Sequence, residues 1–149
     1  MAIVDHISPT HVSQYEDCLE TAPLVCIDGN VPTETIQYVC RVCAQHGVPV
    51  WYEPTCIDKS TKPFLSDSWQ TLSYISPNYR ELCRMVECLD GRDGSGPIPS
   101  AEPLVLEDKL EVCLELCQRL LRHVHCVLVT LGEDGLLVCR NSEPDQPFL

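Results

Sequence analysis

Short apolar runs alternate with amphipathic segments along most of this chain, and this alternation limits the folds that it can adopt. Runs too short for helices, and rich in Val, Ile, Leu, Tyr or Cys, predict strands at 24–27, 48–52, 74–76, 125–131 and 136–139. Alternating strands and helices form mainly parallel sheets with helices on both faces, so we expect a three-layer α/β/α domain. The tight turn Gly132-Glu133-Asp134-Gly135 predicts that the last two strands pair as a hairpin.

Helix signals lie between the predicted strands. Pro32 opens a segment whose apolar residues recur at helical spacing, and Gly47 stops it. Ser8 is a predicted cap for the first helix. We expect helices at about 9–19, 32–46, 64–72, 78–88 and 106–121. Glycine and proline recur through 90–103, which predicts a loop there.

Charge and cysteine content exclude several classes of function. With 10 Lys+Arg against 22 Asp+Glu, the net charge of −12 argues against nucleic acid and membrane surfaces as partners. No apolar run approaches the roughly 20 residues that cross a bilayer. The 11 cysteines are odd in number, lie within apolar runs and follow no secretory signal. We therefore expect reduced thiols and an intracellular protein, cytoplasmic or in the mitochondrial matrix.

Polar residues follow each predicted parallel strand. In sequence order they are Asp28 and Asn30, Glu53, Asn78 and Glu81, and Thr130 and Gly132. Open α/β sheets bind ligands outside the carboxyl ends of their strands, so these residues are expected at one edge. Asn78 and Glu81 stand three apart at the start of a predicted helix, which places an amide and a carboxylate one turn apart.

Four segments together carry a resemblance to a known family. They are Cys26-Ile27-Asp28-Gly29-Asn30, Trp51-Tyr52-Glu53-Pro54-Thr55, Ser76-Pro77-Asn78-Tyr79-Arg80-Glu81-Leu82 and Val129-Thr130-Leu131-Gly132-Glu133-Asp134-Gly135. Their sequence and order resemble the ribokinase-like (PfkB) carbohydrate kinases, and within them the pseudouridine kinase branch. The resemblance covers nearly the whole chain, so it is far more specific than any one motif.

This resemblance implies a ribokinase-like fold and an ATP- and Mg²⁺-dependent kinase. The implied acceptor is a small nucleoside or sugar, most closely pseudouridine, phosphorylated on its 5′-hydroxyl. In the family, the pair matching Asn78 and Glu81 organises Mg²⁺, water and phosphate. The positions matching Thr130 and Gly132 lie on the nucleotide side. Asp28, Asn30 and Glu53 are expected on the substrate side.

Each of these residues also has a purely structural explanation. Asn78 and Glu81 fit a capping box, and Gly132 with Gly135 fits a hairpin turn. The substrate-side residues could simply order their loops, and Lys59 could be a solvated loop lysine. A zinc site at Cys40, Cys43 and His46 is disfavoured because no second pair of ligands has matching spacing.

The family's Gly-Ala-Gly-Asp segment, which carries the catalytic base and an anion hole, does not occur in this sequence. Residues 91–97 are glycine-rich but lack the motif and precede the wrong elements. We therefore expect residues 1–140 to be the central part of an incomplete kinase domain, 141–149 to be a disordered tail, and the chain to be inactive alone. Two alternatives are a non-catalytic regulatory or dimerisation fragment, and another α/β module that binds a small ligand. Self-association into a homo-oligomer is left open.

Overall fold

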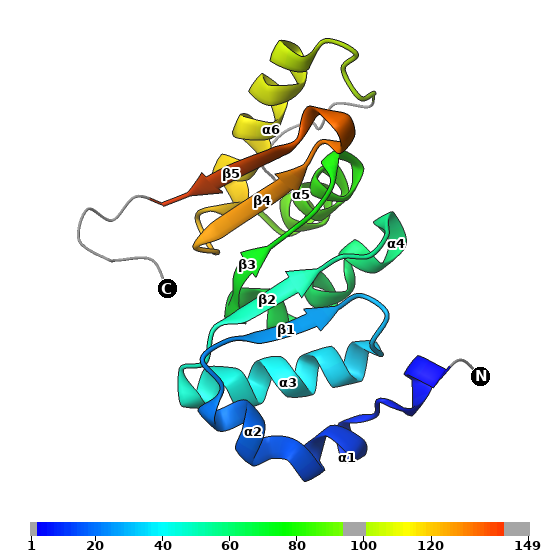
Figure 1. The fold of residues 1–149 in the computed structure, drawn as a ribbon, viewed down its shortest axis with the longest axis vertical. Helices are drawn as coiled ribbons and strands as arrows, with labels where there is room; N and C mark the ends of the chain where they lie inside the picture. Colours follow the sequence, from blue (N-terminus) through cyan, green and yellow to red (C-terminus); the bar gives the residue numbers. More distant parts are fainter. Residues whose placement is uncertain (1–2, 94–100, 142–149) are drawn as a thin grey trace.

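The structure, a computed structural model, describes residues 3–93 and 101–141 and contains one five-stranded sheet (Figure 1). The strand order is β1-β2-β3-β4-β5, with β1 to β4 parallel and β5 antiparallel to β4. The strands are β1 Val25–Asp28, β2 Val50–Glu53, β3 Leu72–Ile75, β4 Cys126–Thr130 and β5 Leu136–Arg140. A largely parallel sheet that ends in a hairpin is confirmed.

The helices begin and end near the predicted signals. The α-helices are α1 Pro9–Val12, α2 Glu16–Thr21, α3 Thr33–His46, α4 Ile57–Ser60, α5 Tyr79–Asp93 and α6 Leu106–Leu120. The 3₁₀ helices are η1 Ile3–His6, η2 Ser13–Tyr15, η3 Lys62–Leu65, η4 Asp67–Thr71 and η5 Gly132–Asp134. The Ser8 hydroxyl oxygen accepts from the backbone nitrogen of His11, and Gly47 ends α3 at a φ of 67°. None of the described helices has the length and apolarity needed to cross a membrane.

Several boundaries differ from the sequence-based expectation. The first expected helix is broken by η2, and the one expected at 64–72 is replaced by η3 and η4. The strand expected at 48–52 begins at Val50, whereas the third begins earlier, at Leu72. Stacking of the Phe64 and Trp69 rings, 6.2 Å between centroids, joins the two short 3₁₀ helices. Packing between neighbouring residues therefore overrides the simple helical pattern here.

Helix α5 runs through Asp93, well into the loop expected at 90–103. An Asp90 carboxylate oxygen lies 2.5 Å from a guanidinium nitrogen of Arg119 on α6. The two side chains are 9% and 15% exposed, so this ion pair is largely removed from water. It supplies a tertiary reason for the helix to continue past its predicted end. Residues 94–100 and 142–149, half of the expected loop and nearly all of the expected tail, lie outside the described residues.

One row of side chains crosses the whole sheet and is buried on one face. It contains one residue from each strand, namely Ile27, Tyr52, Ile75, Val127 and Cys139. Consecutive strand order combined with right-handed crossovers places the connecting helices on that same face. Figure 1 shows the strands of the upper half in front of α5 and α6. Among the described residues, no helix covers the opposite face, so the second helical layer of the expected sandwich is not among them.

A tight contact joins the loop after β1 to the loop after β2. A Cβ placed on Gly29 would lie 2.3 Å from the carbonyl oxygen of Pro54 and 2.8 Å from Cβ of Lys59. Next to Pro54, Thr55 adopts a φ of 71°, which is rare for a residue other than glycine. The Thr55 hydroxyl oxygen accepts from the Gly29 backbone nitrogen at 3.2 Å. Only glycine permits this approach of the two loops.

Replacement of Asp90 by Ala should lower the free energy of unfolding by about 2–3 kcal/mol, because Arg119 loses its nearest carboxylate partner while staying largely buried. The double change Asp90→Leu/Arg119→Met should cost much less, because neither charge then remains. Urea denaturation of the two proteins would measure both effects. Equal losses in the two variants would contradict this account.

Gly29→Ala should also destabilise the fold, by about 1–3 kcal/mol, because the backbone of Pro54 blocks the added methyl group. Gly91→Ala is the matched control, since a Cβ there meets nothing within 4 Å and the residue lies in α5. Helix propensity predicts a gain of roughly 0.5–1 kcal/mol for that control. Thermal melts of both variants would test the contrast, and a neutral Gly29→Ala would refute it.

Candidate functional site

Asn78 and Glu81 form a reciprocal pair at the start of α5. The Asn78 backbone nitrogen donates to Oε2 of Glu81 at 2.8 Å, and the Glu81 backbone nitrogen donates to Oδ1 of Asn78 at 2.9 Å. This is a capping box, which was the structural alternative for these residues. Glu81 is only 4% exposed, whereas Asn78 is exposed. The cap fixes both side chains and still leaves acceptor positions on the carboxylate for other donors.

Thr130 lies directly beside this pair. Asn78 and Thr130 form an isolated parallel β-bridge, and the Thr130 backbone nitrogen donates to the Pro77 carbonyl at 2.9 Å. Gly132 follows with a φ of 62°, and Gly135 with a φ of 94°, so the turn between β4 and β5 uses both glycines. The structure thus brings Asn78, Glu81 and Thr130 together, with Gly132 in the adjoining turn.

The substrate-side residues form a second group at the ends of β1 and β2. Asp28 and Glu53 are partners in the strand register, and both are exposed. Oδ1 of Asp28 accepts from the Asn30 backbone nitrogen at 2.8 Å, and Asn30 Nδ2 donates to the other carboxylate oxygen at 3.3 Å. Asp28 and Asn30 therefore order their own loop, and they leave it with exposed acceptor groups.

Two lysines hold this loop from the segment after β2. Lys59 Nζ donates to Oδ1 of Asn30 at 2.6 Å. Lys62 Nζ donates to the carbonyls of Gly29 and Val31 at 2.7 and 2.8 Å. Burial first, and then the nearby Lys59 charge, lower the pKa of Lys62. The role of Lys62 was not predicted from the sequence, and Lys59 was expected to be solvated. The available signal was that two of the chain's few lysines follow closely after the end of a strand.

Ser76 connects the two groups. Its hydroxyl donates to Oε2 of Glu53 at 2.5 Å and accepts from the Trp51 indole nitrogen at 2.7 Å. Ser76 is 9% exposed and lies two residues before Asn78. This bridge was not predicted, because sequence periodicity does not reveal contacts between neighbouring strands. It links the end of β2 to the segment that positions Asn78.

The donor set fits magnesium held together with a nucleotide better than a protein-only metal cage. Among residues 3–93 and 101–141, no cluster of three or more His, Cys, Asp or Glu could hold a metal ion. Mg²⁺ usually keeps several waters and is bound through one or two carboxylates plus substrate phosphates. A fixed carboxylate at Glu81 and an amide at Asn78 match that limited protein contribution.

The two cysteines of the disfavoured zinc site lie in the core. Cys40 and Cys43 are 1% and 0% exposed. Burial raises the pKa of the Cys40 thiol to about 12, so this thiol stays protonated at neutral pH. His46 lies at the end of the same helix, with Nε2 3.3 Å from a carboxylate oxygen of Glu20. These positions behave as small apolar core residues and not as ligands.

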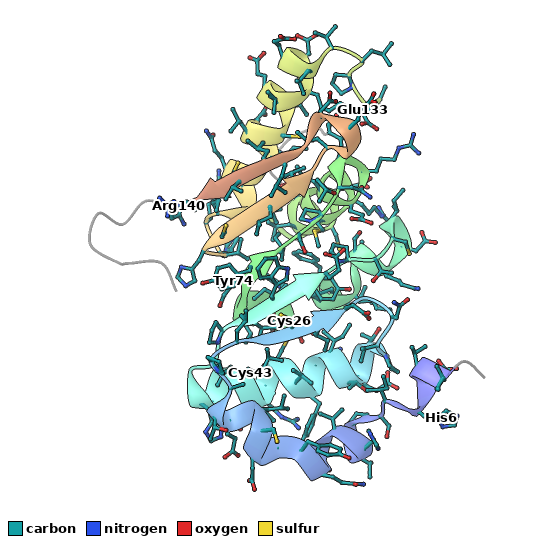
Figure 2. All side chains as sticks on the ribbon, in the orientation of Figure 1. His6, Cys26, Cys43, Tyr74, Glu133 and Arg140 are labelled. Carbon is teal, nitrogen blue, oxygen red and sulfur yellow. The ribbon has the colours of Figure 1, made fainter. Side chains whose placement is uncertain are left out.

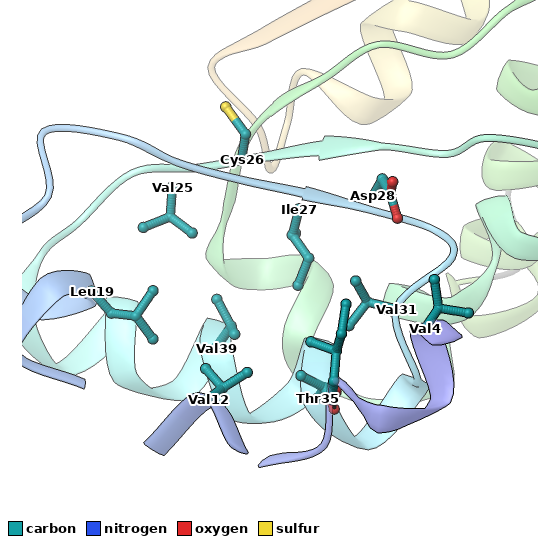
Figure 3. Close-up of a pocket in the computed structure, with 11 residues that line it drawn as sticks. Val4, Val12, Leu19, Val25, Cys26, Ile27, Asp28, Val31, Thr35 and Val39 are labelled. Atoms are coloured by element: carbon teal, nitrogen blue, oxygen red, sulfur yellow. Dashed lines mark hydrogen bonds between the residues drawn. The ribbon is translucent and has the colours of Figure 1, made fainter. Parts of the chain in front are cut away.

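An apolar cavity of about 330 Å³ lies between the N-terminal segment, β1 and α3 (Figure 3). Figure 3 shows Ile27 pointing toward α3, while Cys26 points to the other side of β1. The lining is aliphatic apart from Cys26, Asp28 and Thr35. None of Asn78, Glu81 and Thr130 borders it, and its lining offers few donors to a phosphate. The cavity is therefore separate from the group of Asn78, Glu81 and Thr130, although Asp28 of the substrate-side group borders it.

Comparison with curated proteins gives two relatives of known name. The chain is 29% identical over 145 residues to the pseudouridine kinase of Arabidopsis thaliana, covering 96% of this chain and 38% of that protein. It is 26% identical over 77 residues to the ribokinase of Bacillus subtilis, covering 52% of this chain and 25% of that protein. The chain thus spans well under half the length of either relative.

Comparison with solved structures shows the same fold. Arabidopsis thaliana ribokinase, solved with ribose and ATP, superposes with a TM-score of 0.60 at 20% identity, covering 91% of this chain and 36% of that chain. The match confirms the ribokinase-like α/β fold expected from the sequence. Residues 3–146 match the sequence profile of the pfkB family carbohydrate kinases. The chain therefore belongs to the pfkB family of carbohydrate kinases.

Proposed function

We propose that this chain supplies the central, phosphate-organising part of an ATP- and Mg²⁺-dependent kinase that phosphorylates the 5′-hydroxyl of pseudouridine. The observation that carries the proposal is the convergence of Asn78, Glu81 and Thr130, three residues matched to the family's motifs, at the carboxyl ends of β3 and β4. The choice of pseudouridine rests on the extent of the similarity to the Arabidopsis enzyme, which includes 96% of the chain.

Glu81 has the chemistry for ordering metal-bound water. Bound Mg²⁺ would neutralise charge on the transferring phosphoryl group. The Glu81 carboxylate, fixed by the Asn78 backbone nitrogen, would accept hydrogen bonds from metal-bound waters and so orient them. Glu81 is nearly buried, so its carboxylate is already held in one orientation. Little free energy would therefore be needed to orient it during the reaction.

Thr130 and Gly132 would form the nucleotide side. The exposed Thr130 hydroxyl can donate to a phosphate oxygen or to its water. Gly132 has no side chain and adopts a positive φ, so a nucleotide can approach the backbone of the turn. These two residues follow β4, and the bridge to Asn78 places Thr130 beside the proposed metal-organising pair.

Asp28, Asn30 and Glu53 would form the substrate side. Exposed carboxylates accept hydrogen bonds from the vicinal hydroxyls of a ribosyl group. Lys59 and Lys62 hold the loop of Asp28 and Asn30 in one conformation, which lowers the ordering cost of binding. Phosphoryl transfer also needs a base for the acceptor and an anion hole, and we assign neither role to a residue of this chain.

Glu81→Gln should lower kcat by about 10- to 100-fold and raise the Mg²⁺ concentration needed for half-maximal rate, because the shape remains but the charge is lost. The measurement is a Mg²⁺ titration of pseudouridine phosphorylation in the kinase that carries this segment. Glu87→Gln, a change of an exposed residue on the same helix, is the control and should change neither quantity. Unchanged turnover and Mg²⁺ dependence in Glu81→Gln would reduce Glu81 to a helix cap.

The 149-residue chain by itself should leave a radiolabelled-ATP assay with pseudouridine at background, because no Gly-Ala-Gly-Asp segment occurs in its sequence. Mg²⁺-dependent formation of pseudouridine 5′-phosphate by the purified chain would contradict this expectation. Such a result would place the catalytic base among residues that we do not assign to catalysis.

A further inference from the structure

A lysine on α6 reaches the turn that carries Gly132. Nζ of Lys109, near the start of the helix, lies 3.1 Å from Oε1 of Glu102 and 3.7 Å from Oδ2 of Asp134. The lysine side chain is 13% exposed, and the two carboxylate side chains are 36% and 35% exposed. Figure 2 labels Glu133 at this turn, beside the ribbon where α6 begins. Lys109 therefore joins the tip of the turn to a helix and to the segment that precedes this helix.

Hydrogen bonds within the turn set its shape. The Asp134 backbone nitrogen donates to the Leu131 carbonyl at 3.2 Å. The Gly135 backbone nitrogen donates to the Gly132 carbonyl, also at 3.2 Å. Both bonds join residues of the turn to one another, so they do not determine where its tip stands relative to the helices. The ion pair of Asp134 with Lys109 supplies that position.

The same network reaches the first turn of α5. Nε of Arg80 lies 3.7 Å from Oε2 of Glu102. The hydroxyl of Tyr79, a residue that is 4% exposed, donates to the Ala101 carbonyl at 3.5 Å. Tyr79 and Arg80 stand inside the capping box that begins this helix. A continuous series of contacts therefore runs from the proposed metal-organising pair, through Glu102 and Lys109, to the turn on the nucleotide side.

The charge of Lys109 also affects what the turn can bind. Glu133 and Asp134 place two carboxylates next to Gly132, and these repel a polyphosphate that approaches the backbone there. The hydrogen bond to Glu102 first, and then the charges of Glu102 and Asp134, raise the pKa of Lys109. The ammonium group therefore stays protonated at neutral pH, and its positive charge offsets the negative charge of Asp134.

We propose that Lys109 is a positioning residue for the nucleotide, which holds the Gly132 turn against the start of α5 and offsets the charge of Asp134. The ligand is a nucleoside triphosphate, and in this respect the proposal rests on the proposed function. Lys109 acts through the turn and touches neither the acceptor nor the reacting atoms. Its loss should therefore weaken nucleotide binding and leave the substrate side, at the ends of β1 and β2, unaffected.

Steady-state kinetics of the kinase that carries this segment separate this role from a purely structural one. Lys109→Met keeps an aliphatic stem but removes the charge, so the KM for ATP should rise about 10-fold while the KM for pseudouridine changes by less than about twofold. Lys109→Arg keeps the charge and should recover most of the loss. Arg84→Met is the matched control, since Arg84 forms its ion pair with Glu87 within α5, and it should change neither KM. An unchanged KM for ATP in Lys109→Met, or an equal rise in both KM values, would overturn the proposal.

Hydrogen exchange of the purified 149-residue chain tests the same contact without any assay of activity. The backbone amides of 131–135 should exchange at least about threefold faster in Lys109→Met, whereas those of α3 should keep their rates and so show that the fold is intact. Unchanged exchange of the turn would overturn the proposal, and the proposed function would stand without it if the kinase is active. A loosened turn, combined with no ATP-dependent phosphorylation by the kinase that carries this segment, would instead overturn the proposed function and the nucleotide role of Lys109 with it.

Discussion

The whole structure depends on one continuous row of five buried side chains, one from each strand. Ile27, Tyr52, Ile75, Val127 and Cys139 stand in register across the sheet, and the helices of the described part of the chain pack against this row from one side. Because side chains alternate along a strand, burying this row forces the neighbouring row onto the other face. The same register therefore sets both the core and the surface that remains open. It also brings the ends of β1 to β4 to one edge, where the polar loops meet.

At that edge, structural and chemical roles are combined in the same residues. The capping box that starts α5 is also the arrangement that fixes the Glu81 carboxylate beside Thr130. Asp28 and Asn30 order their loop while keeping groups at the surface. Glu53 belongs to the proposed substrate side and also accepts from the Ser76 hydroxyl, which ties the end of β2 to the segment before α5.

Local signals in the sequence predicted much of this fold because their causes are local. Gly47 ends α3 in the left-handed conformation that favours glycine, and Ser8 caps α1 through its own side chain. The extension of α5 past residue 88 could not be predicted, because its partner, Arg119, lies 29 residues away from Asp90. The Ser76 link to Glu53 and the Lys62 contacts were missed for the same reason. Sequence patterning identified the strands but not their order, and strand order, together with the right hand of the crossovers, decides which face the helices cover.

The stacking of Trp51 on Tyr74 has an optical consequence. The sequence contains two tryptophans, and they occupy opposite environments: Trp69 is 9% exposed within η4, whereas Trp51 lies on the sheet face opposite the described helices. Emission from Trp69 therefore reports on the packed side of the sheet, and emission from Trp51 reports on the other side. Replacing Trp69 by Phe would leave a single fluorophore at the uncovered surface. Its wavelength would then act as a built-in indicator of whether that surface meets water or another polypeptide.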